Sequence, residues 1–184
     1  MLECYKILIL FISVYFISGA IMKPDCNGGA FSADIIIVED SRESLKMLTK
    51  IFHGQNYSVR PAESCEAALE LIKGKLPDLI VLDILMPDMN GYDFCRKLKS
   101  EKITSSIPII FCSALNDENA RIEGFKSGGS DYIIKPFSPI EVLSRVKIHL
   151  EMKRALSEID SHKKNLETLV KERNVHIEKR SDEL

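Results

Sequence analysis

Residues 78–91 constrain the fold of this 184-residue chain more than any other stretch. Four apolar residues, 79–82, precede a single carboxylate, Asp83, and a loop with Pro87 and Gly91 follows. A short apolar run between turn residues is typical of a strand buried on both faces, as in parallel sheets covered by helices. We therefore expect Asp83 at the carboxyl end of a strand, where open α/β sheets bind ligands. A single Asp there can equally be a helix N-cap or a turn residue.

The chain from Asp34 onward alternates apolar runs with segments of helical periodicity. This alternation predicts a doubly wound α/β fold: a five-stranded parallel sheet of order 2-1-3-4-5, the flavodoxin-like arrangement. The predicted strands are 35–38, a short one around 59, 79–82, 107–112 and 132–134. The predicted helices are 41–55, 64–74, 92–99, a polar one at 116–126, and a last one that begins with Ser138 as its N-cap.

Polar residues end four of these strands at the same edge of the sheet. Glu39 and Asp40 follow the first strand, which is a neighbour of the third at about 4.8 Å in this strand order. Carboxylates this close repel one another, and a hard divalent cation such as Mg²⁺ would neutralise them. Glu39 and Asp40 can instead simply cap the first helix. Ser113 and Lys135, which end the fourth and fifth strands, add a hydroxyl donor and a cation and favour a binding site.

Over residues 34–150 the chain resembles the receiver domain of two-component response regulators. The matching features are the acidic pair Glu39-Asp40, Asp83 with its Pro- and Gly-containing loop, Ser113 thirty positions later, Tyr132, and Lys135-Pro136-Phe137.

This resemblance implies that a partner sensor histidine kinase phosphorylates Asp83, with Mg²⁺ as cofactor. It implies metal ligation by Asp40 and Asp83 directly, by Glu39 through water, and by the backbone carbonyl of Leu85. Lys135 and Ser113 would hold the phosphoryl oxygens, and a cis peptide would join Lys135 to Pro136. The family usually has two aspartates where this chain has Glu39-Asp40, and this difference bears on metal affinity.

Ser113 and Tyr132 are the expected switch residues. Ser113 would move toward phosphorylated Asp83 and vacate space into which Tyr132 turns, although Tyr132 can equally be a core aromatic. The positions two beyond Asp83 and Ser113 are Leu85 and Leu115, whose side chains cannot orient an attacking water. We therefore expect a long-lived phosphoryl group.

After the receiver-like part, residues 151–184 predict a coiled coil. Apolar residues recur in steps of four and three, with two cations on the same seam, at Met152, Leu156, Ile159, Lys163, Leu166, Val170, Arg173 and Ile177. A helix from 140 to about 180 would be roughly 60 Å long. A parallel two-stranded coiled coil that dimerises the chain is the leading interpretation, and a solvated single helix is the alternative. His149, His162 and His176 are expected to be solvated.

The first 31 residues form an apolar N-terminal segment whose run at 7–22 resembles a secretory signal. Three interpretations stay open: sequence upstream of a true start at Met22, an anchor facing the cytoplasm, and secretion. We expect a cytoplasmic protein, because the receiver-like domain at 32–150 needs a cytoplasmic phosphodonor. The five cysteines contain no Cys-x-x-Cys pair and are expected to be reduced. Lys and Arg form no basic block, which argues against direct nucleic-acid binding.

Three classes of function remain. The first is a phosphoacceptor switch, not an enzyme, which signals through residues 116–150 and the coiled coil to an output domain or effector protein. The second is the N-terminal regulatory part of a diguanylate cyclase, phosphodiesterase or hybrid histidine kinase. The third is a scaffold whose receiver no longer accepts phosphate.

Overall fold

The structure is a computed structural model that describes residues 33–87, 89–115 and 117–182. The side chains of residue 172 and of residues 174–182 are also outside the description, so the seam position Ile177 and His176 are not assessed. The expectations for the apolar segment 1–31 likewise lie outside the described residues.

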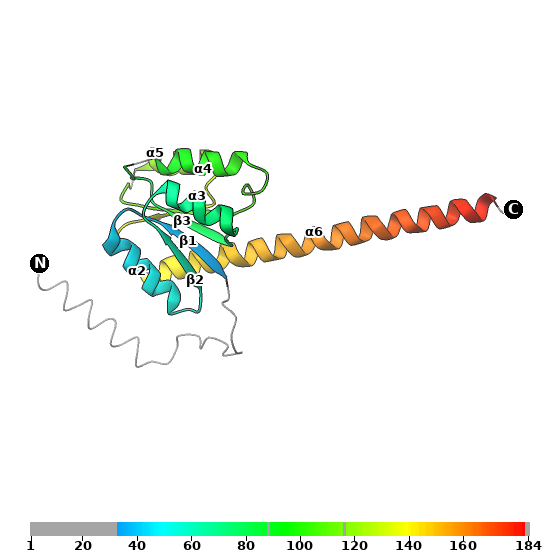
Figure 1. Cartoon of the computed structure of the whole chain (residues 1–184), viewed down its shortest axis with the longest axis horizontal. Coiled ribbons are helices and arrows are strands. Elements are labelled where there is room, and N and C mark those ends of the chain that lie inside the picture. The colour runs from blue at the N-terminus through cyan, green and yellow to red at the C-terminus, as the bar shows by residue number, and fades with distance from the viewer. Residues whose placement is uncertain (1–32, 88, 116, 183–184) are drawn as a thin grey trace, which may run out of the picture. The chain divides into compact units, whose positions relative to one another are not determined.

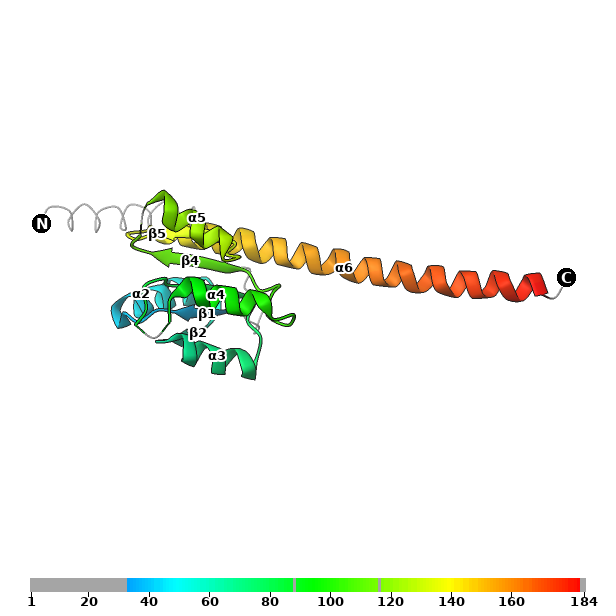
Figure 2. The same ribbon diagram turned by 90° about the horizontal axis from the view of Figure 1, so that it is seen from above.

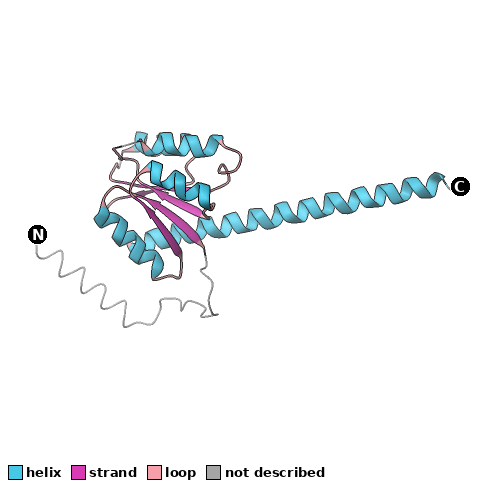
Figure 3. Ribbon diagram, viewed as in Figure 1, coloured by secondary structure: helices cyan, strands magenta, loops and turns pink. Residues whose placement is uncertain are grey.

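Strands and helices alternate along the described chain (Figure 3). The strands are β1 (Asp34–Val38), β2 (Ser58–Ala62), β3 (Leu79–Leu82), β4 (Ile109–Ser113) and β5 (Asp131–Ile134). The helices are α2 (Arg42–His53), α3 (Cys65–Gly74), α4 (Gly91–Ser100), α5 (Glu118–Lys126) and α6 (Pro139–Asp182).

All four strand pairings in the described sheet are parallel, and the strand order is β2-β1-β3-β4-β5. The doubly wound fold expected from the sequence is therefore confirmed. Because β1 pairs with β3 through Val38 and Leu82, the residues that follow these strands are neighbours at the carboxyl edge.

Helices cover both faces of the sheet (Figures 1 and 2). An apolar core lies on each face. On one face α2 and α6 pack against alternate strand residues; Phe52 and Val146 are fully buried there. On the other face α3 and α4 cover the remaining strand residues, with Phe94 and Phe111 fully buried. This burial on both faces explains why β1, β3 and β4 are apolar without alternation.

Side-chain caps set the starts of all five described helices. Ser41, Ser64, Asn90 and Asp117 each accept a hydrogen bond from a backbone N–H of the first turn. Ser138 accepts from Glu141 N at 3.1 Å and caps α6, as predicted. The polar helix thus begins at Glu118, two residues later than expected from the sequence, because Asp117 is its N-cap.

The fourth strand begins at Ile109, whereas the sequence predicted Ile107. Ile107 N donates to Thr104 O at 3.0 Å and so closes a turn, and Pro108 has no N–H to add to the ladder. The pairing starts with the Pro108 carbonyl, which accepts from Ile80 N at 3.0 Å.

The last helix, α6, is continuous through residue 150, where the sequence placed the end of the receiver-like domain. Its early residues Val142, Val146 and Leu150 are buried against the sheet. From residue 154 to 171 every side chain is exposed. Within residues 33–182, apart from positions 88 and 116, no helix has the length and apolar character that crossing a bilayer requires.

Candidate functional site at the carboxyl edge of the sheet

Three carboxylates meet where β1 and β3 end. Asp83 N donates to Val38 O at 2.9 Å, which continues the β1–β3 ladder and holds Asp83 beside Glu39. Glu39, Asp40 and Asp83 each offer an oxygen, and these oxygens lie within 4.8 Å of one another. Glu39 and Asp83 are buried, whereas Asp40 is exposed. The structure therefore brings together the three carboxylates that the sequence predicted to converge.

Lys135 bridges two of these carboxylates. Its Nζ lies 2.7 Å from Asp83 Oδ2 and 2.6 Å from Glu39 Oε2. Burial lowers the pKa of the Lys135 ammonium, but its hydrogen bonds to Asp83 and Glu39 outweigh burial and raise that pKa overall. Lys135 is therefore a fixed positive charge in the site. The Lys135–Pro136 peptide, which directly follows β5, is cis, as expected.

The pKa of Glu39 is raised above its ordinary value, which indicates negative charge in the site that is not fully neutralised. Burial raises its pKa, and Lys135 only partly opposes this, while Asp83 and Asp40 raise it further. Three carboxylates face one ammonium, so two negative charges are left over when all are ionised. Oxygen ligands with this excess charge fit a hard divalent cation such as Mg²⁺.

The loop after β3 holds the Asp83 side chain by its backbone. Asp83 Oδ1 accepts from Ile84 N at 2.6 Å and from Leu85 N at 3.2 Å. Gly91 N donates to Ile84 O at 3.0 Å and closes the loop. The roles of Ile84 and Gly91 were not predicted. The only signal for them in the sequence is the glycine itself, because backbone donors are not encoded by residue type.

Ser113 and Tyr132 lie next to each other behind the site. Ser113 is completely buried at the end of β4, and its Oγ accepts from Leu115 N at 3.4 Å. Tyr132 is buried, and its hydroxyl donates to Leu115 O at 2.8 Å. Burial raises the pKa of Tyr132, and hydrogen bonding with the Tyr92 and Ser113 hydroxyls opposes this increase in part. Tyr132 therefore fills the space beside Ser113 in this structure.

The two leucines that follow the site residues differ in exposure. Leu85 is 54% exposed, whereas Leu115 is partly buried and packs against the core. Both side chains are hydrocarbon, so neither can orient a water by hydrogen bonding.

His149 does not match the expectation of a solvated side chain. Its side chain is only 14% exposed, and Nε2 lies 3.3 Å from Asp131 Oδ2. The prediction was wrong because it considered only whether the histidines could share a metal. It ignored the contact of α6 with the start of β5. His162 is exposed, as expected.

The fold and the site together define a doubly wound α/β protein with an acidic, lysine-bridged site at its strand ends. The model of the response regulator receiver domain matches residues 35–147, more than half of the chain. The chain therefore belongs to the response regulator receiver family of two-component systems.

Several proteins are similar to this receiver domain. The response regulator PleD of Caulobacter vibrioides is 34% identical over 128 residues, which are 70% of this chain and 28% of PleD. The transcriptional regulatory protein YvrH of Bacillus subtilis is 34% identical over 121 residues, 65% of this chain and 50% of YvrH. The chain thus matches half or less of the length of these relatives.

A solved structure of a putative response regulator from Chloroflexus aurantiacus has 38% identity and a TM-score of 0.63; the match covers 65% of this chain and 98% of that one. The signal receiver domain of a histidine kinase from Syntrophus aciditrophicus has 32% identity and a TM-score of 0.62, over 65% of this chain and 91% of that one.

Proposed function

We propose that this chain is a phosphoacceptor switch in which a partner histidine kinase phosphorylates Asp83. The observation that carries the proposal is the contact of Lys135 Nζ with Asp83 Oδ2 at 2.7 Å, beside two further carboxylates at the carboxyl edge. A nucleophilic carboxylate, a fixed cation and a hydroxyl within one site are the groups that phosphoryl transfer requires.

In the proposed transfer, an Asp83 carboxylate oxygen attacks the phosphorus of a phosphohistidine. The new O–P bond forms as the P–N bond breaks, and the leaving imidazole takes up a proton. Lys135 and Ser113 then hold the phosphoryl oxygens. Bound Mg²⁺ would neutralise charge on those oxygens; its ligands would be Asp40, Asp83 and the Leu85 carbonyl, with Glu39 acting through water.

The phosphoryl group is proposed to act on the face formed by residues 116–150. Ser113 and Tyr132 share Leu115 as a backbone partner, so a shift of Ser113 toward Asp83 changes the surroundings of the Tyr132 hydroxyl. Tyr92 and Tyr132 both pack against the ring of Phe111, and the Tyr92 hydroxyl donates to Ala120 O at 2.8 Å, which links α4 to α5.

We further propose that α6 dimerises the chain and passes the signal to an output domain or effector protein in the cytoplasm. Seven large apolar side chains on the described part of α6 are 54–64% exposed, namely Ile148, Met152, Leu156, Ile159, Leu166, Leu169 and Val170. Five of them, Met152, Leu156, Ile159, Leu166 and Val170, are seam positions of the predicted coiled coil, and a second copy would cover them. We do not propose that this chain itself binds nucleic acid.

The test is Mg²⁺-dependent labelling by a small phosphodonor such as acetyl phosphate, followed by intact mass. The wild-type chain is expected to gain one phosphoryl group with Mg²⁺ and none with excess chelator. Asp83→Asn is expected to gain none. Asp93→Asn, which removes an exposed carboxylate on α4, serves as the control and is expected to label like wild type. Equal labelling of Asp83→Asn would contradict the proposal, and an unlabelled wild type would favour a scaffold.

A further inference from the structure

The three strands that carry the site residues Glu39, Asp83 and Lys135 each have an aspartate at the opposite end. Asp34 opens β1, Asp78 immediately precedes β3, and Asp131 opens β5. These aspartates lie at the amino edge of the sheet. They have no part in the proposed phosphoryl transfer, and the contacts below give them a different role.

Helix α6 contacts this edge through three cationic or titratable side chains spaced four residues apart, Arg145, His149 and Lys153. This spacing puts them on one face of the helix. Arg145 Nη1 lies 3.0 Å from both carboxylate oxygens of Asp131, and His149 Nε2 lies 3.3 Å from Asp131 Oδ2. The turns that carry Arg145 and His149 are therefore held at the start of β5.

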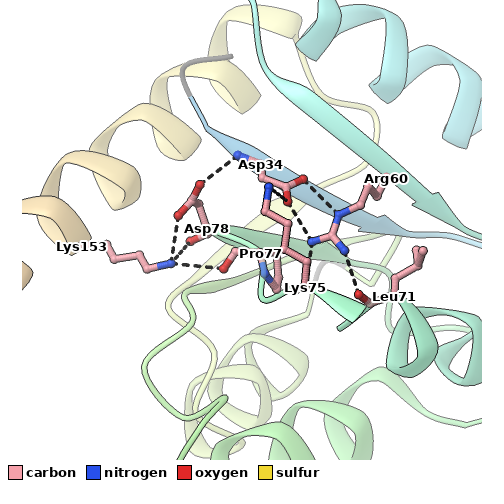
Figure 4. A network of polar contacts seen from close by, with 7 residues as sticks. All are labelled: Asp34, Arg60, Leu71, Lys75, Pro77, Asp78 and Lys153. Carbon is pink, nitrogen blue, oxygen red and sulfur yellow. Dashed lines mark hydrogen bonds and ion pairs between the residues drawn. The ribbon is translucent and has the colours of Figure 1, made fainter. Parts of the chain in front are cut away.

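Lys153 makes the next contact one turn further on (Figure 4). Its Nζ donates to the carbonyls of Asp78 at 3.0 Å and Pro77 at 3.2 Å, and to Asp78 Oδ1 at 3.3 Å. An ammonium has three N–H donors, so these three acceptors match its capacity. The loop before β3 thus forms a socket for the Lys153 head group.

The socket is itself braced by β1 and β2 (Figure 4). The second oxygen of Asp78, Oδ2, accepts from Asp34 N at 2.9 Å. The Asp34 carboxylate lies 3.0 Å from Arg60 Nη2 and 3.2 Å from Lys75 Nζ. Arg60 also donates to the carbonyls of Leu71 at 2.8 Å and Lys75 at 3.0 Å. Both oxygens of Asp78 are therefore engaged, one by the helix and one by β1.

Lys153 marks the place where α6 leaves the sheet. Among the side chains of α6 that the structure describes, it is the last half-buried one, and every side chain from 154 to 171 is exposed. The Lys153 and Asp78 side chains are 30% and 48% exposed, so their ion pair adds little to the free energy of unfolding. A contact that matters little for stability can still fix a direction, because a small tilt at this point is magnified along the exposed part of the helix.

We infer that Lys153 is a positioning residue: bound in the Pro77–Asp78 socket, it sets the direction in which the exposed part of α6 leaves the receiver domain. Arg145 and His149, bound to Asp131, hold the preceding turns, and Lys153 fixes the final one. This inference does not depend on phosphorylation of Asp83.

The test is a distance distribution between spin labels at Lys97→Cys on α4 and Ser161→Cys on α6, measured by pulsed electron paramagnetic resonance. Cys4 and Cys26 are replaced by Ser, and labelled chains are diluted with unlabelled chains so that only distances within one chain are recorded. Wild-type Lys153 is expected to give one narrow distance peak. Lys153→Met is expected to lose it and give a broad distribution.

Two further variants distinguish an effect on the direction of α6 from an effect on folding. Lys153→Arg keeps a cationic donor and is expected to retain the narrow peak. Lys164→Met removes another lysine of α6, one whose partner Asp160 is on the helix itself, and is expected to leave the peak unchanged. The urea midpoint of all variants should stay close to wild type. A narrow peak in Lys153→Met, or equal broadening in Lys164→Met, would overturn the inference.

Discussion

At the scale of single residues, Gly91 lies against the backbone that positions Asp83. A Cβ at this position would collide with the Asp83 carbonyl oxygen and lie 2.8 Å from Ile84 Cα. Because both neighbours are backbone atoms, the loop that carries Asp83 would have to move. Glycine at position 91 therefore allows the close approach that holds Asp83 in place.

We predict that Gly91→Ala lowers the free energy of unfolding by about 2 kcal/mol, the range expected for overpacking, and slows labelling of Asp83. Gly74→Ala is the control, because nothing lies within 4 Å of a Cβ there, and we expect it to be neutral or up to about 1 kcal/mol stabilising. Urea unfolding followed by circular dichroism measures both. Equal stability of the two variants would contradict this account of the loop.

Leu85 gives a second prediction at this scale. Its exposed hydrocarbon side chain cannot hold a water in line with a phosphoryl group on Asp83. Leu85→Asn supplies an amide that can, and we expect loss of phosphate to speed up several-fold, as measured by the decay of the phosphorylated mass after the phosphodonor is removed. Leu76→Asn, another exposed leucine, is expected to decay at the wild-type rate. A faster wild-type decay than that of Leu85→Asn would refute the idea.

The sequence predicted which residues stand at the site, but not the hydrogen bonds that hold them there. Glu39, Asp40, Asp83, Ser113 and Lys135 were located because parallel strands end at a common edge, and strand ends can be recognised from apolar runs. The bridge from Lys135 to Glu39 was not predicted, because it depends on side-chain rotamers. The backbone N–H groups that bind Asp83 were not predicted either, because every residue except proline has one.

At the scale of elements, β5 joins the proposed phosphorylation site to α6. Lys135 follows its carboxyl end, and Asp131 stands at its amino end, bound to Arg145 and His149. Burial raises the pKa of Asp131, but hydrogen bonds from Tyr132 N, Arg145 and His149 outweigh it and lower the pKa below 3.8. A carboxylate with a lowered pKa stabilises the folded state at neutral pH, and that contribution disappears as the pH falls through the folded-state pKa.

We therefore predict that Asp131→Asn lowers the free energy of unfolding at pH 7 by about 1–3 kcal/mol, the range for hydrogen bonds to a charged group. The difference from wild type should begin to shrink below about pH 4, where the carboxylate of the unfolded chain becomes protonated, and should shrink further as the pH falls toward the lowered pKa of the folded state. Urea unfolding between about pH 3 and 7 measures it. The control is Asp160→Asn, whose carboxylate is exposed beside Lys164, and no comparable pH dependence is expected. A constant difference across this pH range would contradict the assignment.

The exact ends of helices and strands could not be predicted from the sequence pattern. The α5 start at Glu118 and the β4 start at Ile109 each differ from the sequence-based boundary by two residues. In both cases a local hydrogen bond sets the boundary. Asp117 caps α5, and Ile107 N donates to Thr104 O in a turn, so that β4 begins only at Ile109. Apolar periodicity does not contain that information.

At the scale of the whole molecule, the long helix α6 divides into a docked part and an exposed part. The docked part is fixed by the apolar core on the α2 face. The exposed part carries the apolar seam, whose repeat in steps of four and three was visible in the sequence because it depends only on spacing. The contact between Lys153 and Asp78, where the helix leaves the sheet, was not predicted, because these residues are far apart in the sequence.

We predict that Ile159→Lys, which places a charge in the middle of the seam, weakens self-association of the chain at least about tenfold, corresponding to about 1.4 kcal/mol. Ile140→Lys is the control, since Ile140 is 65% exposed in the first turn of α6 and lies off the seam. Sedimentation equilibrium measures both. A wild-type chain that is monomeric at high concentration would instead support a solvated single helix.

Asp83 is the residue that we propose receives the phosphoryl group. The most direct test locates the phosphoryl group after Mg²⁺-dependent labelling, by peptide mass spectrometry with and without hydroxylamine, which cleaves acyl phosphates. We expect one hydroxylamine-labile phosphoryl group on the peptide that contains Asp83. A phosphoryl group that resists hydroxylamine, or one located on Asp40 or Ser113 instead, would contradict it.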